Sequence, residues 1–102
     1  MDNELARFLA DDRAMTLLRT IDRMNPMDVP VNRLSTIREV ADVLGWPVMD
    51  TWKLIDAGVR TGVLMYCGGV LSRRRVDLTE KGEDVVDTDG TEELRKIIKG
   101  EI

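Results

Sequence analysis

The strongest concentration of one charge in the chain is a run of three arginines, Arg73, Arg74 and Arg75. Residues 63–78 hold only one carboxylate besides them. Guanidinium groups are always charged and match phosphate oxygens in geometry. The run therefore indicates a phosphate clamp or, alternatively, a solvated row of side chains paired with nearby carboxylates. Those carboxylates are Asp77, Glu80 and Glu83.

Few of the residue types that support catalysis or metal binding are present. The chain has no histidine and one cysteine, Cys67, so it lacks the commonest general base and a standard zinc ligand set. Neither a GxxxxGK[ST] loop nor a GxGxxG loop occurs. Without a neighbouring histidine or second cysteine, Cys67 does not indicate redox sensing. We therefore expect no enzyme activity, no metal site and no cofactor.

Length and composition favour a single globular domain over residues 1–102. The chain is 43% hydrophobic and 33% charged, as is typical of globular proteins rather than disordered ones. No stretch of eighteen apolar residues occurs, and the N-terminus lacks the basic and apolar segments of a signal peptide. With no membrane span expected and no internal disulfide possible, a cytoplasmic location is the simplest expectation.

Charge is unevenly distributed along the sequence. Residues 1–78 hold 11 acidic and 11 basic side chains, whereas residues 79–102 hold 8 acidic and 4 basic ones. The whole net charge of −4 therefore lies in the C-terminal segment. The arginine run directly precedes this acidic segment.

Apolar residues at helical spacing predict the elements that must position these side chains. We expect a short leading turn and then a first helix over residues 12–24. Ser35 or Thr36 as N-cap, with Glu39 as capping-box partner, predicts a second helix that ends at Gly45. A third helix follows over about residues 48–60.

The period then changes to that of a β-hairpin. Residues 63–67 and 70–78 read as two strands around a Gly68-Gly69 turn. A two-residue turn there would pair Tyr66 with Leu71 and Leu64 with Arg73. It would place Arg73 and Arg75 on the face opposite the core.

Three weaker predictions complete the set of elements. The segment around Val29 and Val31 could add an edge strand. Thr79 caps a fourth helix over residues 80–86, and Asp89 with Glu92 opens a last helix.

Two short helices joined by a Gly turn and followed at once by a hairpin resemble the winged helix-turn-helix regulators of the arsenic-repressor and multiple-antibiotic-resistance types. Ala41 before the Gly45 turn and Gly62 after the third helix match glycine and alanine positions of those families. The junction at residues 78–82, LTEKG, and the segment at residues 9–13, LADDR, are also similar to theirs. The resemblance covers roughly residues 8–86.

This resemblance implies a mainly α fold with a small β-hairpin, a winged helix-turn-helix with core residues 12–86. It also implies binding of duplex DNA and a role in transcription regulation. In such proteins the third helix enters the major groove and offers its outward face to bases and phosphates. Helical geometry predicts an outward face made of Met49, Asp50, Lys53, Asp56, Ala57 and Arg60.

We expect Lys53 and Arg60 to contact DNA from this helix, and Arg73, Arg74 and Arg75 to contact it from the wing. Asp50 and Asp56 oppose DNA binding because each would face the phosphates. The alternative function is a winged-helix protein-interaction module without intrinsic DNA binding. It would contact its partner through the acidic C-terminal segment and through an apolar patch of Met49, Trp52 and Leu54, if these side chains are exposed.

The tryptophans and the chain ends also allow two interpretations each. Packing at the border of the core is the favoured one for Trp52, and Trp46 is expected to plug the core from the turn. Apolar stripes in the terminal extensions, residues 1–11 and 89–102, predict a homodimer across a two-fold axis. The alternative is that they pack within one chain. The two stripes are Leu5, Phe8 and Leu9, and Leu94, Ile97 and Ile98.

Overall fold

The computed structural model describes residues 3–88 and consists mainly of helices with one small sheet. The α-helices are α1 (Asn3–Ala10), α2 (Ala14–Met24), α3 (Ile37–Leu44), α4 (Val48–Arg60) and α5 (Glu80–Asp87). Two strands, β1 (Leu64–Tyr66) and β2 (Val76–Leu78), pair as an antiparallel hairpin. Single 3₁₀ turns, η1 (Val31–Arg33) and η2 (Leu71–Arg73), lie in the connections. The predicted combination of helices with a small hairpin is confirmed.

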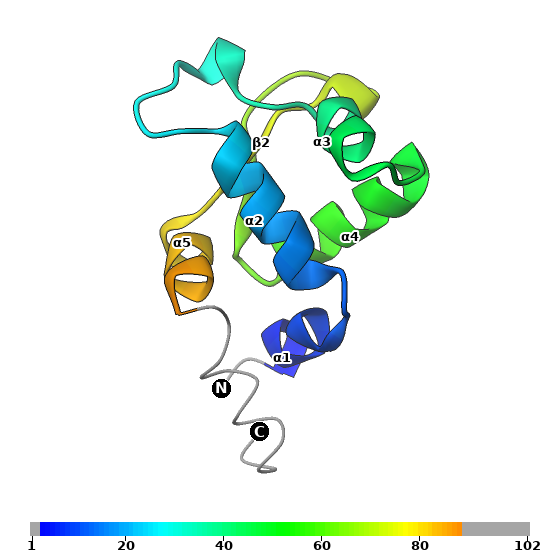
Figure 1. The fold of residues 1–102 in the computed structure, drawn as a ribbon, viewed down its shortest axis with the longest axis vertical. Helices are drawn as coiled ribbons and strands as arrows, with labels where there is room; N and C mark the ends of the chain where they lie inside the picture. Colours follow the sequence, from blue (N-terminus) through cyan, green and yellow to red (C-terminus); the bar gives the residue numbers. More distant parts are fainter. Residues whose placement is uncertain (1–2, 89–102) are drawn as a thin grey trace.

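Helix α2 lies at the centre of the arrangement (Figure 1). In this view α3 and α4 lie to its right, α5 lies to its left, and the hairpin passes behind it. Helix α1 lies below α2 and packs on both α2 and α4. The hairpin is therefore enclosed by helices on one side and leaves its connecting loop at the edge of the molecule.

The second and third predicted helices form as expected because their ends carry strong local signals. Thr36 accepts a hydrogen bond from the Glu39 amide at 3.2 Å, and the Glu39 carboxylate accepts one from the Thr36 amide at 3.1 Å. This is the predicted capping box, which satisfies two free amides at the start of α3. Gly45 ends α3 in the left-handed region at φ 70°, where glycine carries no steric penalty.

The register of the hairpin differs from the prediction. Leu64 pairs with Leu78 and Tyr66 pairs with Val76, whereas a two-residue turn would have placed Arg73 opposite Leu64. The physical reason is burial: Leu64, Val76 and Leu78 are all buried, and the observed register puts them on one face. Residues 67–75 consequently form a long connecting loop, called the wing loop below.

The edge strand predicted near Val29 and Val31 does not form. Residues 31–33 are a 3₁₀ turn with Val31 exposed, and the third pairing partner of the sheet is instead Thr36, which bridges to Arg75. Buried Asn25 supports this pairing. Its side-chain amide donates to the Val76 carbonyl at 2.8 Å and accepts from the Ser35 amide at 2.8 Å.

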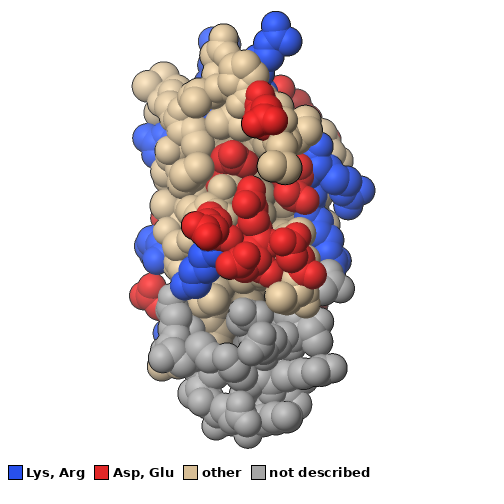
Figure 2. Space-filling view, turned by 90° about the vertical axis from the view of Figure 1, so that its left-hand side faces the viewer, with Lys and Arg blue, Asp and Glu red and all other residues tan. Residues whose placement is uncertain are grey.

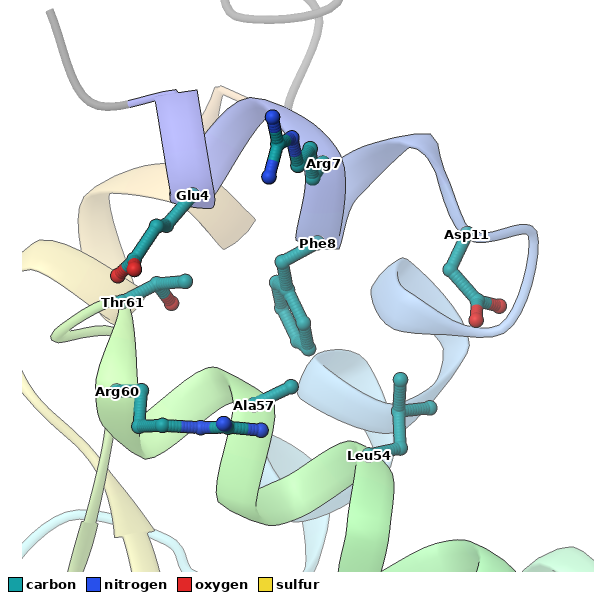
Figure 3. Close-up of a pocket in the computed structure, with 8 residues that line it drawn as sticks. All are labelled: Glu4, Arg7, Phe8, Asp11, Leu54, Ala57, Arg60 and Thr61. Atoms are coloured by element: carbon teal, nitrogen blue, oxygen red, sulfur yellow. The ribbon is translucent and has the colours of Figure 1, made fainter.

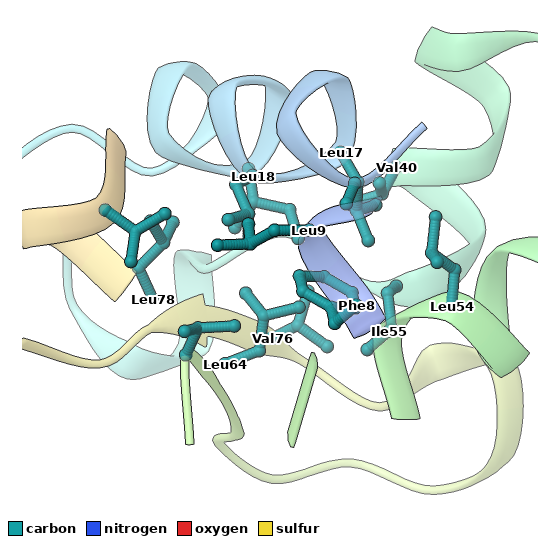
Figure 4. Packing of buried hydrophobic residues seen from close by; sticks show 14 of the residues in the cluster. Phe8, Leu9, Leu17, Leu18, Val40, Leu54, Ile55, Leu64, Val76 and Leu78 are labelled. Atoms are coloured by element: carbon teal, nitrogen blue, oxygen red, sulfur yellow. The ribbon is translucent and has the colours of Figure 1, made fainter. Parts of the chain in front are cut away.

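The N-terminal extension is a two-turn helix that belongs to the core (Figure 4). Leu5, Phe8 and Leu9 are all at most 5% exposed and lie in the same cluster as Leu17 and Ile55. The stripe that was expected to face a second copy is thus used within the chain. The predicted helix after Asp89, with its stripe Leu94, Ile97 and Ile98, lies outside the described residues.

Candidate nucleic-acid interface

The turn between α3 and α4 is fixed by the backbone and by two side chains. The Trp46 amide donates to the Ala41 carbonyl at 3.1 Å, which closes the end of α3. Pro47 precedes the first residue of α4, and the Thr51 hydroxyl donates to its carbonyl at 2.9 Å. Trp46 is partly buried against the core, as expected for a plug in the turn. Helix α4 is therefore held rigidly relative to α3.

Helix α4 presents the outward face that helical geometry predicts. Thr51, Ile55 and Gly58 are buried on the inner side. Met49, Asp50, Lys53 and Arg60 are exposed, while Asp56 and Ala57 are half-buried. The exposed face thus carries both predicted cations and one of the two carboxylates that oppose DNA binding.

The other carboxylate, Asp56, is engaged by two neighbouring groups. One oxygen accepts a hydrogen bond from the Tyr66 hydroxyl at 3.1 Å, and the other lies 3.4 Å from Nε of Arg60 one helical turn away. Burial raises the pKa of Tyr66, although a hydrogen bond with Trp52 acts in the opposite direction. The phenol therefore stays protonated near neutral pH and donates to the carboxylate. Asp56 offers less negative charge to a ligand than its sequence position indicates.

Tyr66 also contacts the wing loop. The Arg74 guanidinium lies over the Tyr66 ring, 4.6 Å from its centroid, in a cation–π contact. Arg60 and Arg74 are thereby gathered around the same Tyr66–Asp56 pair, one from α4 and one from the wing loop. No sequence signal predicts the bond between Tyr66 and Asp56, because that contact depends on how the strand crosses the helix.

The three arginines of the run have different environments. Arg75 is half-buried and donates from its guanidinium to the Leu34 carbonyl, so it ties the wing loop to the start of α3. Arg74 stacks on Tyr66, and Arg73 is exposed. Within residues 3–88 none of the three forms an ion pair with a carboxylate, and the Arg73 guanidinium has no partner. The alternative of a solvated row paired with Asp77, Glu80 and Glu83 is therefore not what the structure shows.

A shallow depression of about 280 Å³ lies on the outward face of α4. It is lined by Met49, Trp52, Lys53, Asp56 and Arg60. Met49 is 60% exposed, whereas Trp52 is half-buried and packs against the core. Leu54, the third member of the predicted apolar patch, is only 6% exposed and does not contribute to it. Its position on α4 turns it toward α1.

Leu54 instead lines a groove of about 350 Å³ between α1 and α4 (Figure 3). Phe8 projects from α1 toward α4, and Arg60 extends along α4 past Ala57. Helix α1 thus covers the flank of α4 that bears Leu54 and leaves the face of Lys53 and Met49 open. This open face runs along α4 from Met49 to Arg60, a length of about three helical turns.

Carboxylates gather on a different side of the molecule, over the face that carries α5 (Figure 2). Glu80, Glu83, Asp84 and Asp87 are all exposed on this helix. Lysine and arginine side chains lie mainly at the margins of this view. Because α5 and α4 lie on opposite sides of α2 (Figure 1), the acidic face points away from the outward face of α4.

The remaining sequence candidates offer no reactive group. Burial, and to a smaller extent Asp77, raises the pKa of the Cys67 thiol, which keeps it protonated and unreactive near neutral pH. Among the described residues, no three histidine, cysteine, aspartate or glutamate side chains are grouped so that they could hold a metal ion. No helix in residues 3–88 has the length and apolar character needed to cross a membrane.

Comparison of the chain with protein-family models, with curated proteins and with solved structures gives no match.

Proposed function

We propose that this chain is a winged helix-turn-helix protein that binds duplex DNA and acts as a small cytoplasmic transcription regulator. Helices α3 and α4 would form the helix-turn-helix unit, and β1, the wing loop and β2 would form the wing. The order of elements and the bridge between Thr36 and Arg75 support this, because they join the start of α3 to the hairpin in one small sheet. Lys53 and Arg60 on α4, with the three wing arginines, would contact DNA.

The observation that carries the proposal is the unpartnered guanidinium of Arg73. It is exposed on the same loop as Arg74, which is linked through Tyr66 and Asp56 to α4. A free guanidinium on a loop that is tied to α4 through Arg74, Tyr66 and Asp56 is suited to the phosphates of a duplex backbone. The acidic face over α5 would point away from the DNA and so orient the protein on it.

The charge of α4 indicates which kind of DNA contact dominates. Asp50 is exposed and can only accept hydrogen bonds, so it is repelled by phosphates and suits few base edges. Most of the affinity would therefore come from phosphate contacts of the wing and of Lys53. We expect weak sequence preference and a strong dependence on salt.

Fluorescence anisotropy with a labelled generic duplex tests this proposal in a matched pair of variants. Arg73→Ala removes the free guanidinium, and Arg23→Ala removes another exposed arginine, from the last turn of α2. We expect Arg73→Ala to weaken binding and to lower the slope of log affinity against log salt by about 1. Arg23→Ala should leave the slope unchanged.

Equal effects of the two substitutions would show that only total charge matters and would refute the assigned interface. Changing all three wing arginines to alanine should lower the slope further. The single Arg73 variant remains the cleaner test, because Arg74 and Arg75 also hold the wing loop in place.

One observation favours the alternative of a protein-interaction module. Met49 is 60% exposed beside the ring of Trp52, in the depression on α4, and exposed apolar side chains of this kind are common in protein interfaces. The same titration separates the two functions. Absence of duplex binding at about 50 mM salt, where even non-specific affinity should be visible, would favour the interaction module.

A homodimer also stays a proposal, and it would not use α1. Because Leu5, Phe8 and Leu9 are buried within the chain, a two-fold contact would have to be made by other residues, such as those of the predicted last helix. Such a dimer would place two α4 helices about one DNA turn apart.

A further inference from the structure

The tip of the wing loop exposes two adjacent aliphatic side chains. Val70 is 70% exposed and Leu71 is 71% exposed. Neither packs against the core cluster, although the loop on both sides of them is hydrogen-bonded to the sheet. The hydrophobic core therefore does not account for this apolar pair.

The tip is built as a fixed shape. The Arg75 amide donates to the Gly68 carbonyl at 2.7 Å, and the Arg74 amide donates to the Leu71 carbonyl at 3.0 Å. Gly69 lies so close to the backbone of Arg73 that a side chain there would overlap it. The exposed aliphatic side chains are thus presented by a tightly closed loop.

Leu71 is held in a conformation that leucine rarely adopts. Its φ is 54°, in the left-handed region, where a Cβ atom crowds the following carbonyl group. Glycine and asparagine tolerate this region far better. A strained leucine whose side chain is 71% exposed indicates that the side chain itself is needed there.

Cations lie directly beside this apolar tip. Arg73 follows Leu71 by two residues and has its guanidinium free within residues 3–88, and Arg74 lies on the Tyr66 ring next to it. Within the described loop, residues 68–75 contain no acidic side chain. An aliphatic tip flanked by guanidinium groups complements the minor groove of DNA, whose rims are phosphates and whose floor and walls are bases and sugars. Leucine wedges at such sites separate stacked base pairs and bend the duplex.

We propose that Leu71, with Val70 beside it, enters the minor groove as a wedge and unstacks a flexible pyrimidine–purine step, while Arg73 contacts the adjacent phosphates. This inference rests on the proposed DNA binding and adds a bending activity to it. It also gives a source for a weak sequence preference that does not depend on the outward face of α4, because TA and CA steps are the easiest to kink.

The test uses the full chain and a short duplex of repeated TA steps in which 2-aminopurine replaces several adenines, so that unstacking raises its fluorescence. Leu71→Asn keeps a residue that accepts the positive φ and removes the wedge. Val31→Asn, at a 60% exposed valine in η1, is the matched control. Anisotropy of the same duplex reports binding separately from unstacking.

Wild-type protein and Val31→Asn should raise the fluorescence several-fold at saturation. Leu71→Asn should bind with a dissociation constant within about threefold of wild type and with the same salt slope, because its phosphate contacts are intact. It should lose most of the fluorescence rise, and its melting temperature should be equal to or above that of wild type.

Two results would overturn the wedge while leaving DNA binding in place: a full fluorescence rise with Leu71→Asn, or saturation by wild type without any rise. Absence of duplex binding by wild type at low salt would instead refute the proposed function, and the wedge with it. Leu71-dependent sedimentation with phosphatidylglycerol vesicles in that case would assign the tip to a membrane surface.

Discussion

At the scale of single residues, Tyr66 connects the two halves of the candidate interface. Its hydroxyl donates to Asp56 on α4 while its ring carries the Arg74 guanidinium. The two contacts use different parts of the side chain, so they can be removed one at a time. Their separate removal shows whether the wing loop depends on α4 for its position.

Tyr66→Phe should lower the free energy of unfolding by about 1 kcal/mol, because a half-buried carboxylate loses its hydrogen-bond donor. Urea unfolding followed by circular dichroism measures this. Tyr66→Ala should cost more and should also weaken duplex binding, since Arg74 then loses the ring on which it lies. If both variants bind and unfold like wild type, the connection is incidental.

The sequence singles out the three arginines of the candidate interface but does not show that their surroundings differ. Arg73, Arg74 and Arg75 are the same residue type, and a regular strand would have placed Arg73 and Arg75 on one face. The structure separates them because Arg75 reaches the Leu34 carbonyl, a residue 41 positions earlier in the chain. Contacts of that kind depend on tertiary packing and have no local signal.

At the scale of elements, the predictions that held were those fixed by local chemistry. The capping box of Thr36 and Glu39, the left-handed Gly45 and the Thr79 cap all act within a few residues. The predicted register of the hairpin was wrong because Gly68-Gly69 is a strong local signal for a two-residue turn. Tertiary packing outweighs that signal. The pairing of Leu64 with Leu78 buries both side chains and requires a longer connecting loop.

The junction of β2 and α5 offers a test at this scale. Gly82, in the first turn of α5, is packed so closely that a methyl group would overlap the carbonyl oxygen of Val63. Gly82→Ala should therefore destabilise the protein by about 2 kcal/mol or more, despite the better helix propensity of alanine. Thermal or urea unfolding measures the loss.

Glu83→Ala, at an exposed position of the same helix, is the control and should change stability by at most about 0.5 kcal/mol. A Gly82→Ala protein as stable as wild type would mean that α5 does not dock against Val63 as described.

At the scale of the whole molecule, α1 is part of the packed domain, and the carboxylates of α5 gather on one side of it. The buried side chains of α1 complete the core next to α2 and α4. The exposed carboxylates of α5 face away from the outward side of α4 (Figures 1 and 2). The burial of α1 and the position of the acidic side chains both depend on how the helices are placed relative to one another. The spacing of residues within each helix does not determine that placement.

The role of α1 can be tested through Phe8, which is 5% exposed. Phe8→Ala should cost about 3–5 kcal/mol, whereas a free extension would tolerate it at little cost. Phe8→Leu, which keeps most of the apolar volume, should remain folded and lose less. Arg7→Ala, on the exposed side of the same helix, should have little effect on urea unfolding. Full stability of Phe8→Ala would contradict the packing of α1.

In the proposed function, the outward face of α4 and the wing loop together form one surface for duplex DNA. Titration of ¹⁵N-labelled protein with a generic duplex at low salt, followed by amide chemical shifts, tests it most directly. We expect shifts concentrated in residues 67–75 and around Met49, Lys53 and Arg60, with the amides of α5 unchanged. Absence of shifts at low salt, or shifts confined to α1 or α5, would contradict it.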